Sequence, residues 1–414
     1  DALDADQWVA AVKSAGMKAL ILTCKHHDGF CLWPSAYTEH SVKNSPWNNG
    51  QGDVVREVSD ACRRGGIKFG VYLSPWDRHD ARYGQGKPYD DYFVSQLTEL
   101  ATNYGDIFCF WFDGACGEGK NGKKQIYDWE RYYAVLRKLQ PNAVLNVCGP
   151  DVRWCGNEAG DTREQEWSVV PAELRDAERT ASKSQQADDG EFSRKIDSQD
   201  EDIGSREVIR NARELVWYPS EVDTSIRTGW FYHPEEDTDV RTAAELLVIY
   251  LDAVGANASL LLNIPPDTHG RIAAPDCASL AELGAKIRQI FASNVTEKAA
   301  IAADSAIAQH PITQAVDGMA DTYWQAAYGQ ESDTITLKFQ KPQKVSCVVL
   351  GEHLPTGQRI ESGEIWADGS KASEFTVVGH KRICRFAPVD VLTLTIKITA
   401  SRTEPTLRLL GVYQ

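Results

Sequence analysis

The 414-residue sequence has no apolar run approaching the roughly 18 residues of a membrane-spanning helix, so an integral membrane protein is excluded. It also has no basic block, because 59 Asp and Glu outnumber 44 Lys and Arg and leave a net charge of −15. We therefore expect no nucleic-acid partner and no affinity for an anionic membrane surface.

The ten Cys include no Cys-x-x-Cys pair, so the spacing of a zinc site is missing. Many of them lie in or just after apolar strand-like runs, and we predict that most are buried small hydrophobes, with one or two disulfides left open. No Gly-rich phosphate loop and no Ser-His-Asp arrangement stands out. No signal peptide opens the sequence, although an export signal removed ahead of Asp1 would leave the same start.

What is present is a soluble globular composition, with 42% hydrophobic and 25% charged residues. The length corresponds to about two or three domains. Twelve Trp, ten of them before residue 300, are a first indication of carbohydrate handling.

Residues 1–291 alternate strand and helix patterns, which predicts an α/β domain with parallel strands and crossover helices. The apolar strand candidates are Lys18–Cys24, Lys68–Ser74, Asp106–Asp113, Ala143–Cys148, Glu164–Val169, Leu215–Val222 and Ala258–Ile264. A capped helix precedes the first of them, and a strand should precede that helix. We therefore interpret the domain as a (β/α)8-like TIM barrel whose first strand is missing from the given chain.

Asp113 ends one of these otherwise apolar stretches. The alternation of the strand turns Phe108, Phe110 and Phe112 toward helices and Asp113 inward, at the carboxyl end where barrel enzymes keep their chemistry. A carboxylate is costly to bury unless it is used or paired. Asp113 is therefore either a nucleophile or general base, or a salt-bridged structural residue.

Glu158 lies in a Gly-flanked loop after the next strand, from where it could reach the same mouth and donate a proton. On the residues alone a solvated loop Glu is the stronger interpretation, and Glu164 or Glu166 compete for the role.

His26 and His27 end the first visible strand, and both reach one ligand only if the strand ends there. Metal chelation favours His-x-His on a strand, so hydroxyl-binding imidazoles are favoured over zinc. Trp33, Trp76 and Trp230 are candidates for stacking on sugar rings, with core packing as the alternative for each.

Five motifs, in order along residues 1–290, closely resemble those of the α-L-fucosidases of glycoside hydrolase family 29. They are Lys25-His-His-Asp-Gly-Phe-Cys-Leu-Trp-Pro-Ser, Tyr72-Leu-Ser-Pro-Trp-Asp-Arg, Trp111-Phe-Asp-Gly-Ala, Gly149-Pro-Asp-Val-Arg-Trp-Cys-Gly-Asn-Glu and Gly229-Trp-Phe-Tyr-His-Pro. The branch acting on α1,3- and α1,4-linked fucose is the most similar. The sugar-binding His and aromatic residues of the family's first strand have no counterpart in the given chain.

By this resemblance, Asp113 matches the catalytic nucleophile and Glu158 the acid/base of a retaining exo-α-L-fucosidase that needs no cofactor for catalysis. The resemblance further implies substrate-binding roles for His26, His27, Trp33, Tyr72, Trp76, Asp77, Arg153, Trp154 and Trp230. The expected partner is a fucosylated oligosaccharide or glycoconjugate, and the expected location is outside the cell or in the periplasm. Another exo-glycosidase on the same barrel, or a non-catalytic fucose- or glycan-binding protein, stays open, as does the oligomeric state.

Residues 292–414 alternate short apolar segments with turns, which predicts an all-β sandwich domain. The stretch Ala315-Val-Asp-Gly-Met-Ala-Asp-Thr-Tyr-Trp resembles a loop that often holds a structural calcium ion in discoidin-like and carbohydrate-binding sandwiches. By that resemblance Asp317, Asp321 and Thr322 are candidate Ca²⁺ ligands, because Ca²⁺ prefers oxygen donors. The alternative is a turn packed beneath Trp324.

Overall fold

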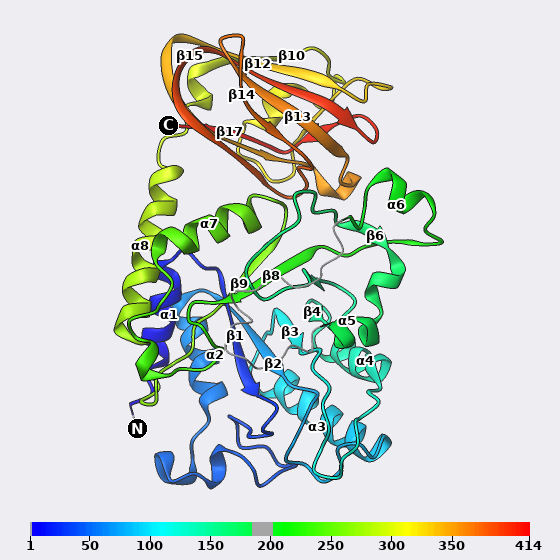
Figure 1. Cartoon of the computed structure of the whole chain (residues 1–414), viewed down its shortest axis with the longest axis vertical. Helices are drawn as coiled ribbons and strands as arrows, with labels where there is room; N and C mark the ends of the chain where they lie inside the picture. Colours follow the sequence, from blue (N-terminus) through cyan, green and yellow to red (C-terminus); the bar gives the residue numbers. More distant parts are fainter. Residues whose placement is uncertain (1, 184–201) are drawn as a thin grey trace.

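Most of the parallel strands of the first domain form where apolar stretches predict them (Figure 1). The computed structural model describes residues 2–183 and 202–414. These parallel strands are β1 (Ala19–Lys25), β2 (Lys68–Leu73), β3 (Cys109–Phe112), β4 (Val144–Val147), β5 (Arg153–Trp154), β8 (Ser220–Ser225) and β9 (Ser259–Asn263). They form two sheets, of order β1-β2-β3-β4 and β5-β8-β9, and a bridge between Asn146 and Val152 joins the sheets.

Helices follow most of these strands, and several of them begin at side-chain caps. Asp53 accepts the Arg56 N–H at the start of α2, and Thr242 forms a capping box with Glu245 at the start of α7. The helices are α1 (Ala5–Ser14), α2 (Val54–Gly65), α3 (Lys87–Asn103), α4 (Trp129–Leu139), α5 (Ala177–Lys183), α6 (Arg206–Arg210), α7 (Ala243–Val254) and α8 (Ala274–Ile290). No helix in the described residues is long and apolar enough to cross a membrane.

Two strand predictions need correction. The predicted strand over 164–169 is wrong, because Arg153 and Arg163 hold the Glu166 side chain and no ladder forms there; only Val169 enters a strand, β6 (Val169–Pro171). The predicted strand over 215–222 divides at Pro219, which has no N–H to donate. Its halves are β7 (Leu215–Trp217), antiparallel to β6, and β8.

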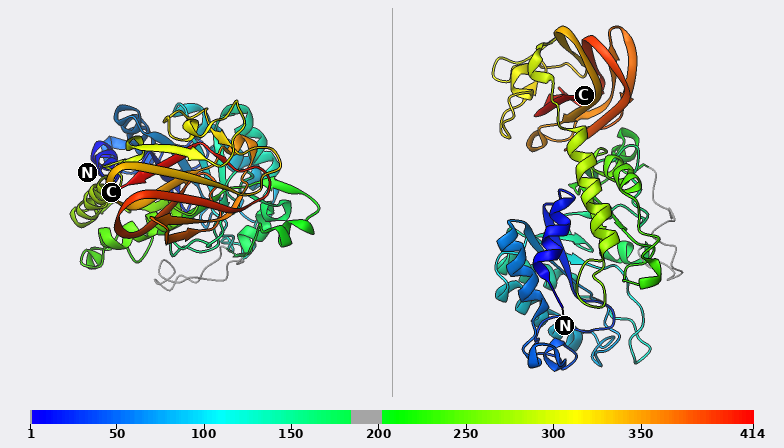
Figure 2. Two further views of the ribbon diagram at one scale, coloured as in Figure 1. Left: turned by 90° about the horizontal axis from the view of Figure 1, so that it is seen from above. Right: turned by 90° about the vertical axis from the view of Figure 1, so that its left-hand side faces the viewer.

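The strands do not close into a barrel, because β9 and β1 share no ladder among the described residues. Instead α1 and α8 lie side by side across this opening (Figures 1 and 2). The contact is close because α8 presents Gly284 to the backbone of Ser14 and Ala15 at the end of α1. The helices therefore hold together the two ends of the strand order.

The second domain is an antiparallel β-structure with a separate hydrophobic core, as the sequence predicts. Its main sheet has the order β10-β12-β15-β13-β14, with β17 also paired to β12. The strands are β10 (Ala299–Ala303), β11 (Trp324–Gln325), β12 (Asp333–Gly351), β13 (Ile360–Ala367), β14 (Ser370–Phe375), β15 (Arg382–Ser401), β16 (Thr406–Leu407) and β17 (Leu409–Tyr413).

All ten Cys lie in the described residues and none forms a disulfide. Eight are buried, so the prediction that most are small core hydrophobes is confirmed.

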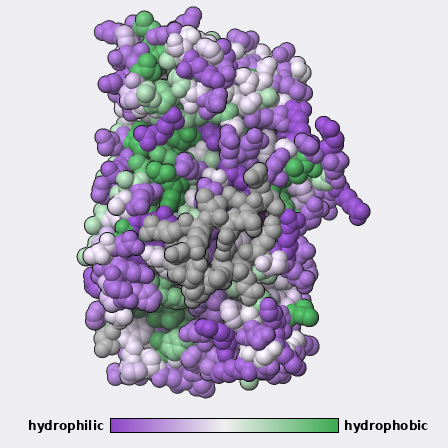
Figure 3. Space-filling model, in the orientation of Figure 1, coloured by the Kyte–Doolittle hydropathy of each residue, from purple (hydrophilic) through white to green (hydrophobic). Residues whose placement is uncertain are grey.

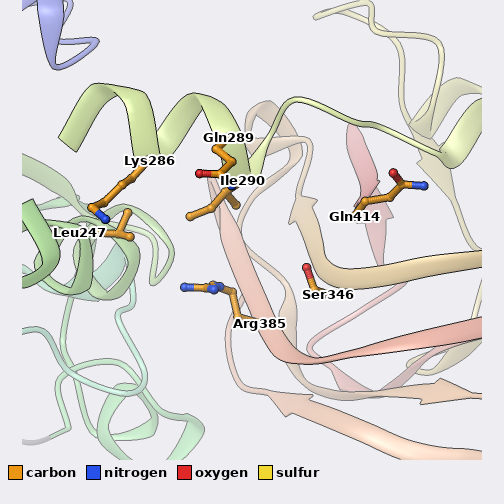
Figure 4. A pocket seen from close by; sticks show the side chains of 7 residues that line it. All are labelled: Leu247, Lys286, Gln289, Ile290, Ser346, Arg385 and Gln414. Atoms are coloured by element: carbon orange, nitrogen blue, oxygen red, sulfur yellow. The ribbon is translucent and has the colours of Figure 1, made fainter. Parts of the chain in front are cut away.

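Part of the contact between the two domains lies at α7 and α8. On the face shown in Figure 3, hydrophobic residues gather near this junction. A cavity of about 310 Å³ opens at the junction (Figure 4). Leu247 on α7 and Lys286 on α8 line one side, and Ser346 and Arg385 of the second domain line the other. The cavity contains none of the side chains predicted to act in catalysis.

The Gly284 contact gives a test of the helix closure. A Cβ at position 284 would lie 1.9 Å from Ser14 O, so Gly284→Ala should destabilise the protein by about 1–3 kcal/mol, although Ala is the better helix former. Chemical denaturation measures this. Ala285→Gly, at the exposed neighbouring position, reports the helix propensity alone; a stabilised Gly284→Ala would contradict the close contact.

Candidate active site

Asp113 follows β3 directly, and both of its carboxylate oxygens are held. Tyr72 on β2 donates its hydroxyl hydrogen to Asp113 Oδ2 at 2.7 Å, and the Ala115 N–H donates to Oδ1 at 2.7 Å. The Asp113 side chain is still 20% exposed. The carboxylate is therefore oriented by protein donors and open to a ligand from one side.

The two His reach this carboxylate because β1 ends at Lys25, which meets the condition that the strand end before them. The Gly29 N–H donates to His26 O at 3.0 Å, and Gly29 adopts φ +78°, which closes a turn. A Cβ at Gly29 would lie 2.4 Å from Asp77 Oδ1, so only glycine fits. Below the turn, Lys25 and Asp77 form a buried ion pair at 3.2 Å.

Burial sets the protonation of the groups around Asp113. It lowers the pKa of His27 to about 4 and lowers the pKa of His26, so both imidazoles are neutral at pH 7. His27 Nε2 lies 3.8 Å from Asp113 Oδ2, and its Nδ1 is 2.7 Å from Ser74 Oγ. Burial, and then the Asp113 charge, raises the pKa of Tyr72 well above its ordinary value, so its hydroxyl remains a donor. Neutral imidazoles and a protonated phenol suit sugar hydroxyls.

Aromatic rings line the same space. The Trp76 ring lies 4.8 Å from the His27 ring, and Phe231 meets the His26 ring edge-on at 5.1 Å. Trp230, half-buried, precedes Phe231, which is 54% exposed. The predicted aromatic positions Trp76 and Trp230 thus belong to the segments around the two imidazoles, and Phe231 joins them without having been singled out from the sequence.

Glu158 acts on the same site electrostatically. Burial raises the pKa of Tyr72 and the pKa of Asp223 well above their ordinary values, and the Glu158 charge raises both further. The side chain is half-buried on the loop that follows β5. The structure therefore brings the two predicted catalytic carboxyl groups, Asp113 and Glu158, into one electrostatic environment.

Two buried carboxyl groups on β8 were missed from the sequence. Asp223 Oδ1 accepts the Trp154 indole N–H at 2.7 Å, which also places the predicted Trp154 beside the site. Glu221 accepts the Trp111 indole N–H at 2.7 Å and the Asn146 amide at 2.9 Å. Glu221 and Asp223 share one face of the strand, and two carboxylates spaced by two in Ser220-Glu-Val-Asp-Thr-Ser were the available signal.

Three residues predicted to contact the sugar have side chains that are buried and engaged by other protein groups, and their direct contact with a sugar stays a prediction. Trp33 is 1% exposed and donates its indole N–H to Glu99 at 2.9 Å. Asp77 is 1% exposed and is used by Lys25 and by the backbone N–H groups of His79 and Asp80. Arg153 is 5% exposed and pairs with Glu166. Each of these side chains is therefore held in place by other residues of the protein.

Glu164 and Glu166, the two residues that compete with Glu158 for the role of proton donor, lie in different surroundings. Glu166 is fully buried between Arg153 and Arg163, so it cannot donate a proton to a bound sugar. Glu164 is exposed, and its carbonyl accepts from Thr376 and Arg382 of the second domain.

One group of side chains has metal-ligand geometry. In the described ranges, His26, His27 and Asp113 form the only set of three His, Cys, Asp or Glu whose ligand atoms all lie within 4.8 Å of one another. Tyr72 and Ser74 already hydrogen bond two members of this set, which is the arrangement of a hydroxyl-binding site.

In the 317–322 loop, Thr322 Oγ1 and the Met319 N–H both donate to Asp317. Calcium binding by this loop stays a prediction.

Burial of Glu221 gives a pH test. Desolvation raises its pKa from 4.5 to about 7, so the folded protein keeps a proton that the unfolded chain releases above pH 4.5. The free energy of unfolding contributed by this group therefore falls as pH rises from about 4.5 to about 7, by about 3 kcal/mol. Glu221→Gln cannot release that proton. Denaturation at pH 4 and pH 8 should show a smaller drop in the variant; equal drops in both proteins would contradict the buried acid.

The chain is similar to known α-L-fucosidases. The family model described as Alpha-L-fucosidase matches residues 1–289. Alpha-L-fucosidase 1 of Arabidopsis thaliana is 37% identical, over 99% of this chain and 78% of the plant protein.

Solved structures give the same result over both domains. The crystal structure of a putative alpha-L-fucosidase from Bacteroides ovatus is 42% identical with a TM-score of 0.83, over 99% of this chain and 66% of that longer chain. A Ruminococcus gnavus GH29 fucosidase in complex with fucose is 28% identical with a TM-score of 0.84, over 100% and 86% of the two chains. With Asp113 at the end of β3 beneath two neutral imidazoles, the chain belongs to the α-L-fucosidase family, glycoside hydrolase family 29.

Proposed function

We propose that this protein is a retaining exo-α-L-fucosidase that removes terminal α1,3- or α1,4-linked fucose from Lewis-type glycans. The observation that carries the proposal is the Asp113 carboxylate, oriented by Tyr72 and faced by two neutral imidazoles. Its relatives and structural neighbours are named fucosidases, and one of them was crystallised with fucose.

In the proposed mechanism, an Asp113 oxygen attacks the anomeric carbon of fucose while Glu158 protonates the departing glycosidic oxygen. The C–O bond to the rest of the glycan breaks, and a covalent fucosyl ester forms on Asp113. Glu158, now ionised, takes a proton from water, and that water attacks the anomeric carbon and frees Asp113. His26, His27 and Tyr72 supply hydrogen bonds to sugar hydroxyls. The proposed chemistry uses no metal or organic cofactor.

The architecture proposed for this enzyme keeps the domain limits of the sequence analysis. Residues 1–291 form the catalytic unit, whose parallel strands follow the order of a (β/α)8 barrel, with no ladder between β9 and β1 in the described residues. Residues 292–414 form a discoidin-like sandwich with Asp317, Asp321 and Thr322 as candidate Ca²⁺ ligands. Because terminal fucose is carried on secreted glycans, we propose an exported location.

The proposal is tested by mixing the protein with a Lewis-type trisaccharide and with its α1,2-fucosylated counterpart. Free fucose should appear from the first alone. The Asp113→Ala variant is the matched control and should release none, because it lacks the carboxylate that forms the ester. Release from the α1,2 substrate would overturn the linkage, and unreduced turnover by Asp113→Ala would overturn the nucleophile. Fucose binding without release from either glycan would indicate a binding protein.

The acid/base assignment is tested through the leaving group. Glu158→Ala should lower turnover of the natural trisaccharide by about 10²- to 10⁴-fold, because its leaving alcohol needs a proton. An aryl fucoside with a 4-nitrophenyl group leaves without that proton and should lose much less in the first step. A matching loss on both substrates would point to another acid.

A further inference from the structure

The segment from Arg163 to Ser168 connects the Glu158 loop to the sandwich domain. Gln358 of the sandwich lies 190 residues beyond Ser168 but bonds this segment with both ends of its amide. Its Oε1 accepts the Ser168 N–H at 2.8 Å, and its Nε2 donates to Glu166 O at 3.3 Å. Gln358 is 4% exposed, so these bonds replace water completely.

Other contacts fix the same segment. Thr376 Oγ1 donates to Glu164 O at 2.6 Å, and Arg382 Nη2 donates to the same oxygen at 3.1 Å. On the other side, Asn257, just before β9, donates to Glu166 O at 2.8 Å and accepts the His380 N–H at 2.6 Å. The main chain of this segment is therefore held by both domains.

The sandwich loops that make these contacts are themselves tied together. Glu352, fully buried, accepts the N–H groups of Arg359 and Ile360 at 2.6 and 2.9 Å, and that of Gly379 at 2.6 Å. Gly379 has φ +59°, and a Cβ there would lie 2.2 Å from Asn257 Cγ. The Gly379 loop therefore packs closely against the Asn257 side chain of the catalytic domain.

An apolar contact accompanies the hydrogen bonds. Val377 of the sandwich packs into a cluster with Trp167 and Tyr218 of the catalytic domain, and the Arg402 guanidinium lies 3.6 Å from the centre of the Trp167 ring. Val377, Trp167 and Tyr218 are all buried, and a hydrogen bond is stronger in such surroundings than in water.

From this segment, charge pairs lead back to the acid/base loop. The buried Glu166 side chain pairs with Arg153 and, at 3.4 Å, with Arg163 Nη1. The same Arg163 Nη1 donates to Cys155 O at 2.9 Å, three residues before Glu158. A shift of Glu166 would therefore be passed to the base of the loop that carries Glu158.

We infer that Gln358 is a positioning residue for Glu158, so that the sandwich domain completes the catalytic machinery. The inference rests on the proposed function of Glu158 as acid/base. In this role the sandwich does not need to bind sugar. Its loops fix the Glu164–Ser168 backbone, and Glu166 and Arg163 transmit this constraint to the Glu158 loop. The position of Glu158 relative to Asp113 is fixed in this way.

The test compares Gln358→Leu with wild type on a Lewis-type trisaccharide and on 4-nitrophenyl fucoside. Leu has a similar size and removes both hydrogen bonds. The kcat/KM for the trisaccharide should fall by about tenfold or more, because a misplaced acid loses much of its effect. The value for the aryl fucoside should fall by less than about threefold, since its leaving group needs no acid. Gln343→Leu, on the far hairpin of β12, is the control and should leave both values unchanged.

Equal losses on both substrates, or no loss on either, would overturn the inference. Thr376→Val keeps the side-chain shape, removes the bond to Glu164 O, and should produce the same selective loss even where Gln358→Leu does not fold. Wild-type turnover reports on the proposed function, and the ratio between the two substrates reports on Gln358, so a failure of either is recognised separately.

Discussion

The structure is organised around one constraint: a carboxylate must be held in place and stay reachable at the end of a strand whose other residues are mostly buried. Asp113 meets it because Tyr72 and the Ala115 N–H replace the water that burial removes. Each donor depends on its own support. Tyr72 stacks on Trp111 at 5.3 Å, and Trp111 is fixed by Glu221 on β8, across the inside of the strand arrangement. Asp113 is thus positioned from three strands.

Much of this was predictable because it is local. Period-two alternation in the Asp106–Asp113 stretch assigned Asp113 to the inner face, and the predicted strand Lys18–Cys24 differs from β1 by one residue at each end. The five motifs then supplied the family. The sandwich followed from short alternating segments without helices.

The remainder depends on contacts between residues far apart in the chain. Trp33, Asp77 and Arg153 stand within the motifs, yet their side chains turn into the core, and a motif does not say which way a loop residue points. Glu221 and Asp223 escaped notice because Ser220–Ser225 is polar for a buried strand. Its polarity is satisfied by indole and amide donors from other strands, which no local pattern reveals. The role of Gln358 is invisible in sequence for the same reason.

The central claim is that Asp113 forms a covalent bond to the sugar. A 2-deoxy-2-fluoro-fucosyl fluoride tests it directly, because the ring fluorine slows both steps while the fluoride leaves without an acid. Mass spectrometry of the treated protein should show one added fluorofucosyl group, and peptide mapping should locate it on Asp113. A label on any other carboxylate, or hydrolysis that begins by inverting the anomeric centre and leaves no label, would contradict the account.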